Sequence, residues 1–498
     1  MTHFSPFLTD FYELTMIQGF LKQDKHKQLA VFDMFYRRNP FGNGFAIACG
    51  LAQVIEYIQN LRFSQADIDY LASLGKFDQD FLDYMADFRF TGDVYAVPEG
   101  TVVFPDEPLL KIIAPLGEAH LIEGAILNIM NHQSLIATKA SRVSYAAKGD
   151  PVMEFGLRRA QGGSAAVLGS RAAVIAGLQF TSNVEAGRSF DLPLAGTHSH
   201  SWVMSFRNEP EAFAAYAEQN PDNCLLLVDT YNTLKSGIPN AIAVFDQLRE
   251  QGKLAPKPDG TLPRYGIRLD SGDLAYLSKQ ARDMLNAAGH PNAIIAASND
   301  LDENLIRDLK HQGAQINLWG VGTNLITSYD QPSFGGVYKL AGLYGRHQDN
   351  NGDYAFYPKI KLSDTPEKIN NPGDKQIVRI YDSATNKIKA DLICLAHETI
   401  SESEPLTLFH PIQTWKKMTL APGTFRTREL LVKIFDQGQL VYNSPSVADM
   451  QAYCHSEKES LWPEFKRLTN PHILPVDLSA ELHALKERMI QKIYNLDI

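Results

Sequence analysis

The sequence has few cysteines, and they stand too far apart to suggest a disulfide framework or a zinc ribbon. The four are Cys49, Cys224, Cys394 and Cys454, and no two of them form a Cys-x-x-Cys pair. Long apolar runs are absent as well, since none approaches the roughly 18 residues that a membrane-spanning helix needs. The first residues also lack the basic and apolar regions of a signal peptide. We therefore expect a cytoplasmic protein without a membrane partner.

An excess of positive charge is missing too. Lysine and arginine together number 47 against 57 aspartates and glutamates, and the formal net charge is −10 at pH 7. Nucleic-acid-binding proteins normally carry a basic surface, so we expect no nucleic-acid partner. The balance does not exclude anionic small molecules, because a few arginines can determine the local potential.

With 498 residues the chain exceeds the usual size of one hydrophobic core, so we expect more than one domain. Residues 1–148 are predicted to form an N-terminal α+β domain with a long helix, and residues 149–345 an α/β barrel. Residues 346–498 are predicted to complete both the N-terminal domain and the barrel. After Leu343 the pattern becomes irregular, and residues 359–375 suggest an exposed excursion. No role for residues 359–388 follows from the sequence.

The first region mixes helix and strand signals. Residues 29–35 have the pattern of a strand, and residues 50–60 that of a helix. Ser64 and Asp67 have the spacing of a capping box that opens a second helix. Residues 92–113 are strand-like, and residues 118–148 form a long helical stretch without proline.

Short apolar strands alternate with amphipathic helices in the second region. The predicted strands are 152–155, 194–196, 224–228, 266–269, 293–297 and 316–321. The predicted helices are 164–179, 201–206, 237–251, 274–288 and 302–311, and a further helix is expected at 479–494. Such alternation is typical of βαβ units with a parallel sheet. Six or seven units suit an irregular α/β barrel better than an open sheet, although the pattern alone does not establish closure.

Polar side chains follow these strands. They are Glu154, Arg158, Arg159, Thr197, His200, Asp229, Asn232, Arg268, Asp270, Asp273, Ser298, Asn299, Gly322 and Thr323. In α/β barrels the carboxyl ends of the strands carry the active site. The sequence therefore predicts one catalytic site built from many strand ends.

Several of these residues suit a phosphate group. Gly320 and Gly322 would let backbone N–H groups approach an anion, although glycine turns after strands are common in any fold. Arg158 and Arg159 could hold phosphate oxygens, but adjacent arginines are equally typical of one buried ion pair and one solvated side chain. The Walker pattern Gly-x-x-x-x-Gly-Lys-Ser/Thr is absent, which excludes a P-loop.

Asp270 and Asp273 could bind ribose hydroxyls or a Mg²⁺ ion carried by a pyrophosphate. The alternative for Asp273 is that it caps the following helix. Asp270 stands at the end of the strand itself and is the better functional candidate.

His198 and His200 suggest a metal site, because His-x-His at a barrel strand end occurs in metal-dependent hydrolases. Such a site needs further ligands on later strands, but His290 lies in a Gly-His-Pro turn and His311 in a predicted helix. A single catalytic histidine at His200, oriented by an acid such as Asp229, fits better. No metal-ligating set is therefore predicted.

Eight segments together make the sequence resemble the nicotinate phosphoribosyltransferase family. They are LTDFYELTM (8–16), EFGLRRAQG (154–162), TSNV (181–184), GTHSHSW (196–202), VDTYN (228–232), IRLDSGD (267–273), ASND (297–300) and GVGT (320–323). The resemblance spans most of the chain, and the motifs are jointly specific.

This resemblance implies an irregular α/β barrel of the type II phosphoribosyltransferases, with an α+β domain built from the N- and C-terminal segments. It also implies a homodimer with active sites at the subunit interface. The implied reaction joins nicotinate to 5-phosphoribosyl 1-pyrophosphate and releases nicotinate mononucleotide and pyrophosphate, the first step of NAD salvage from nicotinate. ATP hydrolysis would be coupled through a phosphohistidine, with Mg²⁺ carried by the pyrophosphate or the nucleotide.

The matching motifs also imply residue roles. His200 would be the phosphorylated histidine and Asp229 its orienting acid. Tyr12 of the partner subunit and Phe155 would sandwich the pyridine ring, while Thr197 and Arg268 would hold the carboxylate. The residues implied around the ribose and phosphates are Arg158, Asp270, Ser298, Asn299, Gly322 and Thr323, with Asp270 counted among the catalytic groups.

Asn183 bears on the choice between acid and amide substrates. The related nicotinamide enzymes have an aspartate at this position, which would accept from an amide and repel a carboxylate, so Asn183 favours nicotinate. A nicotinamide phosphoribosyltransferase is the alternative function. A metal hydrolase using His198 and His200 is a rival of another class, and a non-catalytic scaffold would leave the polar strand ends unexplained.

Overall fold

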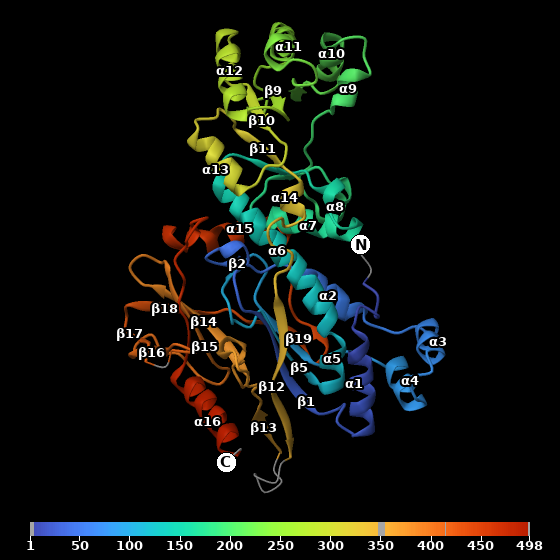
Figure 1. Cartoon of the computed structure of the whole chain (residues 1–498), viewed down its shortest axis with the longest axis vertical. Helices are drawn as coiled ribbons and strands as arrows, with labels where there is room; N and C mark the ends of the chain where they lie inside the picture. Colours follow the sequence, from blue (N-terminus) through green and yellow to red (C-terminus); the bar gives the residue numbers. More distant parts are fainter. Residues whose placement is uncertain (1–3, 347–353, 414, 497–498) are drawn as a thin grey trace. The chain divides into compact units, whose positions relative to one another are not determined.

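The computed structural model describes residues 4–346, 354–413 and 415–496. The chain divides into two compact units (Figure 1). Unit 1 consists of residues 1–138 and 333–498, and unit 2 of residues 139–332. Among the described residues, no helix combines the length and apolar character needed to cross a bilayer.

These boundaries differ from those expected at 148/149 and 345/346. Strand β12 (Gly336–Arg346) pairs antiparallel with β1 (Leu29–Tyr36), which ties the chain after residue 332 to unit 1. Helix α6 (Glu123–Ala147) is continuous and runs from one unit into the other. The division assigns all of residues 333–498 to unit 1, whereas we expected the C-terminal segment to share in the barrel as well.

The main sheet of unit 1 has seven strands in the order β13-β12-β1-β5-β3-β19-β20, and all neighbours are antiparallel. The other members are β3 (Asp93–Ala96), β5 (Leu110–Pro115), β13 (Tyr354–Pro358), β19 (Val432–Asp436) and β20 (Gln439–Leu440), and a separate pair joins β2 (Ala46–Ile47) to β4 (Val102–Val103). The predicted strand at 29–35 is confirmed as β1, and the strand-like stretch at 92–113 as β3, β4 and β5.

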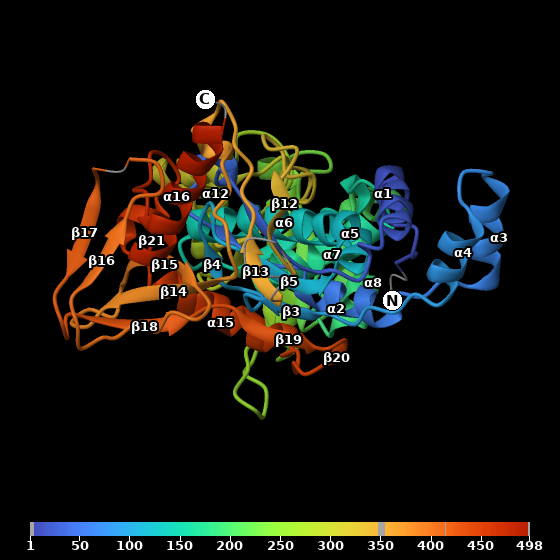
Figure 2. The ribbon, with the colours of Figure 1, turned by 90° about the horizontal axis from the view of Figure 1, so that it is seen from below.

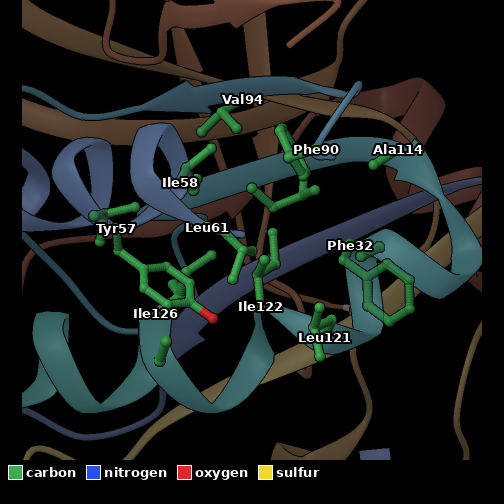
Figure 3. Close-up of a cluster of buried hydrophobic side chains, with 14 of the residues drawn as sticks. Phe32, Tyr57, Ile58, Leu61, Phe90, Val94, Ala114, Leu121, Ile122 and Ile126 are labelled. Carbon is green, nitrogen blue, oxygen red and sulfur yellow. The ribbon is translucent and has the colours of Figure 1, made fainter. Parts of the chain in front are cut away.

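The helices of unit 1 bury an apolar core on this sheet. The helices that pack on this core are α1 (Phe11–Lys22), α2 (Leu51–Asn60), α3 (Gln65–Ser73), α4 (Gln79–Ala86), α5 (Leu116–Leu121) and the start of α6, whereas α15 (Val447–Glu459) lies outside it. Figure 3 shows Tyr57 and Ile58 of α2 between strand residues such as Val94 and helix residues such as Ile126. The capping box predicted for α3 is confirmed, since the Ser64 N–H donates to the Asp67 carboxylate at 2.7 Å.

The C-terminal part of unit 1 is a second sheet, so the irregular structure expected after Leu343 is wrong. Its six strands follow the order β17-β16-β21-β15-β14-β18. They are β14 (Lys375–Asp382), β15 (Ile388–Leu395), β16 (Leu406–Phe409), β17 (Lys417–Leu420), β18 (Phe425–Glu429) and β21 (Val476–Leu478). Figures 1 and 2 show α16 (Ala480–Leu496) beside them. Four of these strands, β16, β17, β18 and β21, have only three to five residues, which gives little alternation to detect in the sequence.

Unit 2 is a parallel sheet covered by helices. Its order is β7-β6-β11-β10-β9-β8, and every pair is parallel. The strands are β6 (Val152–Glu154), β7 (Phe180–Thr181), β8 (Asn223–Leu227), β9 (Arg264–Leu269), β10 (Ile294–Ala297) and β11 (Leu318–Val321). The helices include α7 (Gly163–Ile175), α8 (Val184–Phe190), α9 (His200–Met204), α10 (Glu209–Gln219), α11 (Ile238–Glu250), α12 (Leu274–Ala287), α13 (Glu303–His311) and α14 (Thr323–Ile326). The predicted alternation of strands and helices is confirmed.

The sheet of unit 2 curls towards a barrel. Met153 of β6 and Leu225 of β8 share one buried cluster, although three other strands lie between β6 and β8 in the sheet. The Arg264 guanidinium of β9 also lies 4.9 Å from the ring of Phe180 on β7, at the far edge. Closure is irregular, because the predicted strand at 194–196 makes only an isolated parallel bridge, Thr181 to Leu194. The carboxyl ends of the strands therefore converge, as a barrel requires.

Candidate active site

Arg268, near the end of β9, organises the polar groups at the carboxyl edge of the unit 2 sheet. Its Nε donates to Ser298 Oγ at 2.8 Å, its Nη1 to Thr197 Oγ1 at 2.7 Å and its Nη2 to Asp270 Oδ1 at 2.9 Å. Ser298 follows β10 and also donates closely to the Asp270 carboxylate. Four predicted site residues from three separate segments of the sequence thus form one hydrogen-bonded cluster.

The Asp270 carboxylate is kept ionised by this cluster. Burial alone would raise its pKa, but the hydrogen bond from Ser298 and the charge of Arg268 outweigh burial and lower the pKa below its usual value. Asp273, three residues on, accepts from the N–H of Tyr276 at 2.9 Å and caps α12. The capping alternative for Asp273 is therefore confirmed.

His200 opens α9 and is partly open to solvent, with 41% of its side chain exposed. Its Nδ1 lies 3.1 Å from the hydroxyl oxygen of Thr230, and its Nε2 lies 3.7 Å from Asp270 Oδ2. Thr230 was not singled out in the sequence, although its place beside Asp229 after β8 could have suggested it.

Asp229 does not hydrogen-bond to His200 in the described structure, contrary to the orientation we expected. Its Oδ2 accepts from the N–H of Asp270 at 2.9 Å and from Ser271 Oγ at 2.6 Å. Both donors belong to the loop that follows β9. Asp229 Oδ1 is buried without a hydrogen-bond partner among the described residues. The carboxylate nearest His200 in the recorded contacts is therefore Asp270.

His198 has a structural environment. It is 7% exposed, its Nε2 accepts from the N–H of Leu227 at 3.1 Å, and its ring lies 4.7 Å from that of Tyr216. Burial lowers its pKa to about 4. Because the Leu227 N–H uses the Nε2 lone pair, His198 cannot offer that nitrogen to a metal beside His200. In the described part of the chain, no group of three or more His, Cys, Asp or Glu residues could hold a metal ion.

Phe155 provides an aromatic surface next to Arg268. The Arg268 guanidinium carbon lies 5.6 Å from the centre of the Phe155 ring. Behind the ring, a Cβ atom added to Gly320 would come within 2.8 Å of two ring carbons, so only glycine leaves the ring where it is. A Cβ at Gly322 would be 3.0 Å from the Phe155 carbonyl oxygen. The glycines of the GVGT segment therefore fit the backbone and ring of Phe155.

Asn183 lies in a buried network centred on Glu154. Its Nδ2 donates to Ser170 Oγ at 3.2 Å, while its Oδ1 accepts from the N–H of Ala186 and caps α8. The Glu154 carboxylate accepts from Ser170 Oγ at 2.8 Å and from Thr181 Oγ1 at 2.6 Å. Asn183 is 1% exposed, so a substitution there would disturb this buried network directly.

Other predicted site residues have no recorded contact with the Arg268 cluster. Arg158 is exposed in the short turn Leu157–Arg159 after β6, and Thr323 opens α14. Asn299 is exposed with a φ of 87°, a conformation that is uncommon outside glycine and is often found at functional sites. Tyr12 belongs to unit 1, where it is 48% exposed on α1.

Comparison with family models gives matches along most of the chain. The model described as the nicotinate phosphoribosyltransferase (NAPRTase) N-terminal domain matches residues 7–131. The NAPRTase family model matches residues 151–384, and the C-terminal domain model matches residues 374–486.

Curated relatives and solved structures agree with these matches. The chain is 42% identical over 485 residues to the nicotinate phosphoribosyltransferase of Bacillus subtilis, covering 97% of this chain and 95% of that protein. It is 32% identical to the one from Bos taurus, covering 97% and 96%. The crystal structure of human nicotinic acid phosphoribosyltransferase matches with a TM-score of 0.81 and 29% identity, covering 97% of this chain and 100% of that one. The nicotinate-nucleotide pyrophosphorylase structure from Pyrococcus furiosus shares the fold, with a TM-score of 0.67 at 20% identity over 91% of this chain and 94% of that one.

Proposed function

The chain belongs to the nicotinate phosphoribosyltransferase family and is an enzyme of pyridine nucleotide salvage, and on this premise we propose how its residues act. The substrates are nicotinate and 5-phosphoribosyl 1-pyrophosphate, and the products are nicotinate mononucleotide and pyrophosphate. The observation that carries this proposal is the Arg268 cluster, which gathers a cation, an ionised acid and two hydroxyls at the carboxyl edge of the sheet.

Arg268 and Thr197 bind the nicotinate carboxylate in this proposal. The three recorded bonds of Arg268 use three of the five N–H donors of a guanidinium, so two stay without a partner among the described residues. A planar fork with two free donors matches a carboxylate. Phe155 lies against the guanidinium and offers its face to the pyridine ring.

The chemistry requires positioning more than a base. The pyridine nitrogen is a neutral nucleophile, so the enzyme has to align it with C1 of the ribose and stabilise charge as pyrophosphate departs. Asp270, ionised because Ser298 and Arg268 lower its pKa, favours positive charge on the ribose. Four residues that follow strands at the carboxyl edge of the unit 2 sheet are proposed to bind the phosphates. They are Arg158, Asn299, Gly322 and Thr323.

The acids at this edge also suit a magnesium ion carried by the pyrophosphate. Asp229 Oδ1 is buried without a hydrogen-bond partner among the described residues, and carboxylate oxygens are the ligands that Mg²⁺ prefers. Asp229 and Asp270 would hold the ion. When bound, Mg²⁺ neutralises charge on the leaving pyrophosphate.

We further propose that ATP phosphorylates His200. If Nδ1–H donates to the Thr230 hydroxyl, the lone pair of the exposed imidazole is on Nε2 and is free to accept a phosphoryl group. Thr230, in place of Asp229, would then fix the tautomer. Incubation with γ-labelled ATP should label the wild type and a His311→Asn control, whereas the His200→Asn variant should stay unlabelled.

A homodimer in which Tyr12 of one subunit reaches the site of the other completes the proposal. Tyr12 and Phe11 are about half exposed on α1, as expected of side chains that a second subunit covers. The Tyr12→Ala substitution should raise the KM for nicotinate without lowering kcat in proportion, because it removes a ring contact made before the transition state.

The deciding experiment measures nucleotide formation from labelled nicotinate and 5-phosphoribosyl 1-pyrophosphate, with and without ATP, and with labelled nicotinamide in parallel. Nicotinate should be converted much faster than nicotinamide, and ATP should increase the rate or the yield. Equal or faster conversion of nicotinamide would favour the alternative function, a nicotinamide phosphoribosyltransferase.

A further inference from the structure

A buried acid lies directly beside Tyr12. Glu13 is the third residue of α1, a position that is usually solvated in a capping box, yet it is 0% exposed. Its Oε2 accepts from the backbone N–H of Asp10 at 3.3 Å and makes a close hydrogen bond with the hydroxyl of Thr9. Glu13 thus ties together the turn from which Tyr12 projects.

The same turn is packed on the start of α6. Thr9 Oγ1 lies 3.3 Å from the carbonyl oxygen of Leu121. A Cβ added to Gly124 would stand 3.3 Å from the Cα of Thr9 and 3.6 Å from Glu13 Oε1. The absent side chain at Gly124 therefore lets the turn that precedes Tyr12 and the Glu13 carboxyl lie against the helix.

The second oxygen of Glu13 has no counter-charge. Glu13 Oε1 is buried without a hydrogen-bond partner among the described residues, and so is the hydroxyl of Tyr57 on α2. An ionised carboxylate with an unpaired buried oxygen is costly, whereas the neutral acid can donate its proton.

The charged groups around Glu13 also oppose its ionisation. Asp10 on its own turn and Glu123 at the start of α6 are acidic, and both act on it electrostatically. Burial, followed by these charges, raises the pKa of Glu13 to about 8. His120 on α5 lies 4.0 Å from Glu123, but burial lowers its pKa to about 4, so it carries no compensating charge at neutral pH.

The remaining neighbours act on Glu13 without a neutralising positive charge, although a side-chain hydrogen bond with Tyr12 lowers its pKa slightly against the larger effect of burial. Tyr338 of β12 donates its hydroxyl to the carbonyl of Ala119, and its pKa is raised by burial and by the nearby acids. Lys339 of the same strand acts on Glu123 and donates to the Tyr338 carbonyl. The pKa of Tyr12 is itself raised to about 12 by burial and by the fields of Glu123, Glu13 and Asp10.

We propose that Glu13, in its neutral acid form, is a positioning residue that fixes the first turn of α1 and thereby the ring of Tyr12 for nicotinate binding. Ionisation of Glu13 would place a second buried negative charge beside Glu123, loosen the turn and weaken the substrate contact. This inference rests on the proposed role of Tyr12 in the nicotinate reaction.

The test compares the wild type with Glu13→Gln, because glutamine has the shape of the neutral acid and cannot ionise. In the wild type, the KM for nicotinate should rise about tenfold between pH 7 and pH 9, since only about a tenth of the enzyme keeps the proton one pH unit above the pKa. Glu13→Gln should have the wild-type KM at pH 7 and keep it at pH 9. The same rise in both proteins would overturn the proposal.

Glu118 offers a matched control. It is also a buried acid of unit 1 whose pKa burial raises, to about 7, but it binds Thr91 and has no recorded contact with the Tyr12 turn. Glu118→Gln should keep the wild-type rise of KM with pH. Loss of that rise in Glu118→Gln as well would overturn the specific role of Glu13.

Thermal unfolding without substrate gives an independent readout. The folded protein holds a proton that the unfolded chain lacks between the ordinary pKa of 4.5 and about 8. The melting temperature of the wild type relative to Glu13→Gln should therefore fall as pH rises from 5 to 8 and then level off. A constant difference would show that Glu13 is ionised in the folded protein and would refute the proposal.

Failure of the proposed function and failure of the proposed role of Glu13 give different results. A wild type that makes no nucleotide from nicotinate contradicts the proposed function. An active wild type whose KM for nicotinate is unchanged by Tyr12→Ala contradicts only the role of the Tyr12 turn.

Discussion

Arg379 in unit 1 and Arg268 in unit 2 are both bonded through all three guanidinium nitrogens, but to different kinds of partner. Arg379 is 0% exposed and binds two carboxylates, those of Asp391 and Glu457, at 2.6 and 2.7 Å. Arg268 is 15% exposed and binds one carboxylate and two hydroxyls. A pair of buried acids holds an arginine permanently, whereas neutral hydroxyls and free donors leave it able to bind an anionic ligand. The partners of a charged group therefore distinguish a structural site from a binding site.

The largest expected effect is a loss of stability when the buried ion pairs of Arg379 in unit 1 are broken. Arg379→Met should lower stability by about 3–5 kcal/mol, because the buried Asp391 would lose its counter-charge and Glu457 would keep only Arg428. Thermal unfolding measures this loss. Removing the exposed Arg188, which pairs with Glu185 at the surface, should leave the melting temperature unchanged. Equal effects of the two substitutions would contradict the structural role of the Arg379 cluster.

The corresponding change in unit 2 should affect catalysis more than stability. Arg268→Gln should lower kcat/KM for nicotinate about 10- to 150-fold, the range for losing a charge-assisted hydrogen bond of about 1.5–3 kcal/mol. Steady-state kinetics and a melting curve on the same sample separate the two effects. Arg282→Gln is the control, because Arg282 donates only to the backbone carbonyls of Pro291 and Ala293 in the recorded contacts. It should leave the KM for nicotinate as it is.

An acid introduced at position 183 tests the preference for nicotinate over nicotinamide, with an expected effect similar to or smaller than that of Arg268→Gln. Asn183→Asp should lower the efficiency with nicotinate and raise that with nicotinamide, changing their ratio by about tenfold or more. The ratio is the proper readout, because the new acid also loses its bond to Ser170 and lies near Glu154. Ser170→Ala disturbs the same network without adding charge and should preserve the ratio. A ratio that both variants leave unchanged would refute the selectivity argument.

The smallest expected effect is a change in the KM for nicotinate when the space beside the Phe155 ring is filled. Gly320→Ala should raise the KM for nicotinate several-fold, because the added methyl group displaces the Phe155 ring from its position beside Arg268. Gly19→Ala on α1 has nothing within 4 Å of its new methyl group and should leave the KM unchanged. A wild-type KM for Gly320→Ala would mean that Phe155 does not contact the substrate.

Much of unit 2 could be predicted from the sequence because its strands are short apolar runs that end abruptly in polar residues. That pattern predicts a shared site for Arg268, Asp270, Ser298 and Thr197, and their side chains do meet. Asp229 was matched to His200 by motif, but the direction of a carboxylate depends on which donors a neighbouring loop presents. Here the donors are Ser271 and the N–H of Asp270.

Residue types and their spacing along the chain suffice to establish the family, the alternation of strands and helices, and the set of polar strand ends. Tertiary structure decided which of the two histidines faces solvent and which is buried against β8, and that the C-terminal segment forms a sheet. It also decided that Glu13 is buried against α6. The physical reason is that burial and hydrogen-bond partners come from residues distant in sequence, and they determine whether a polar side chain is charged, neutral or free to bind a ligand.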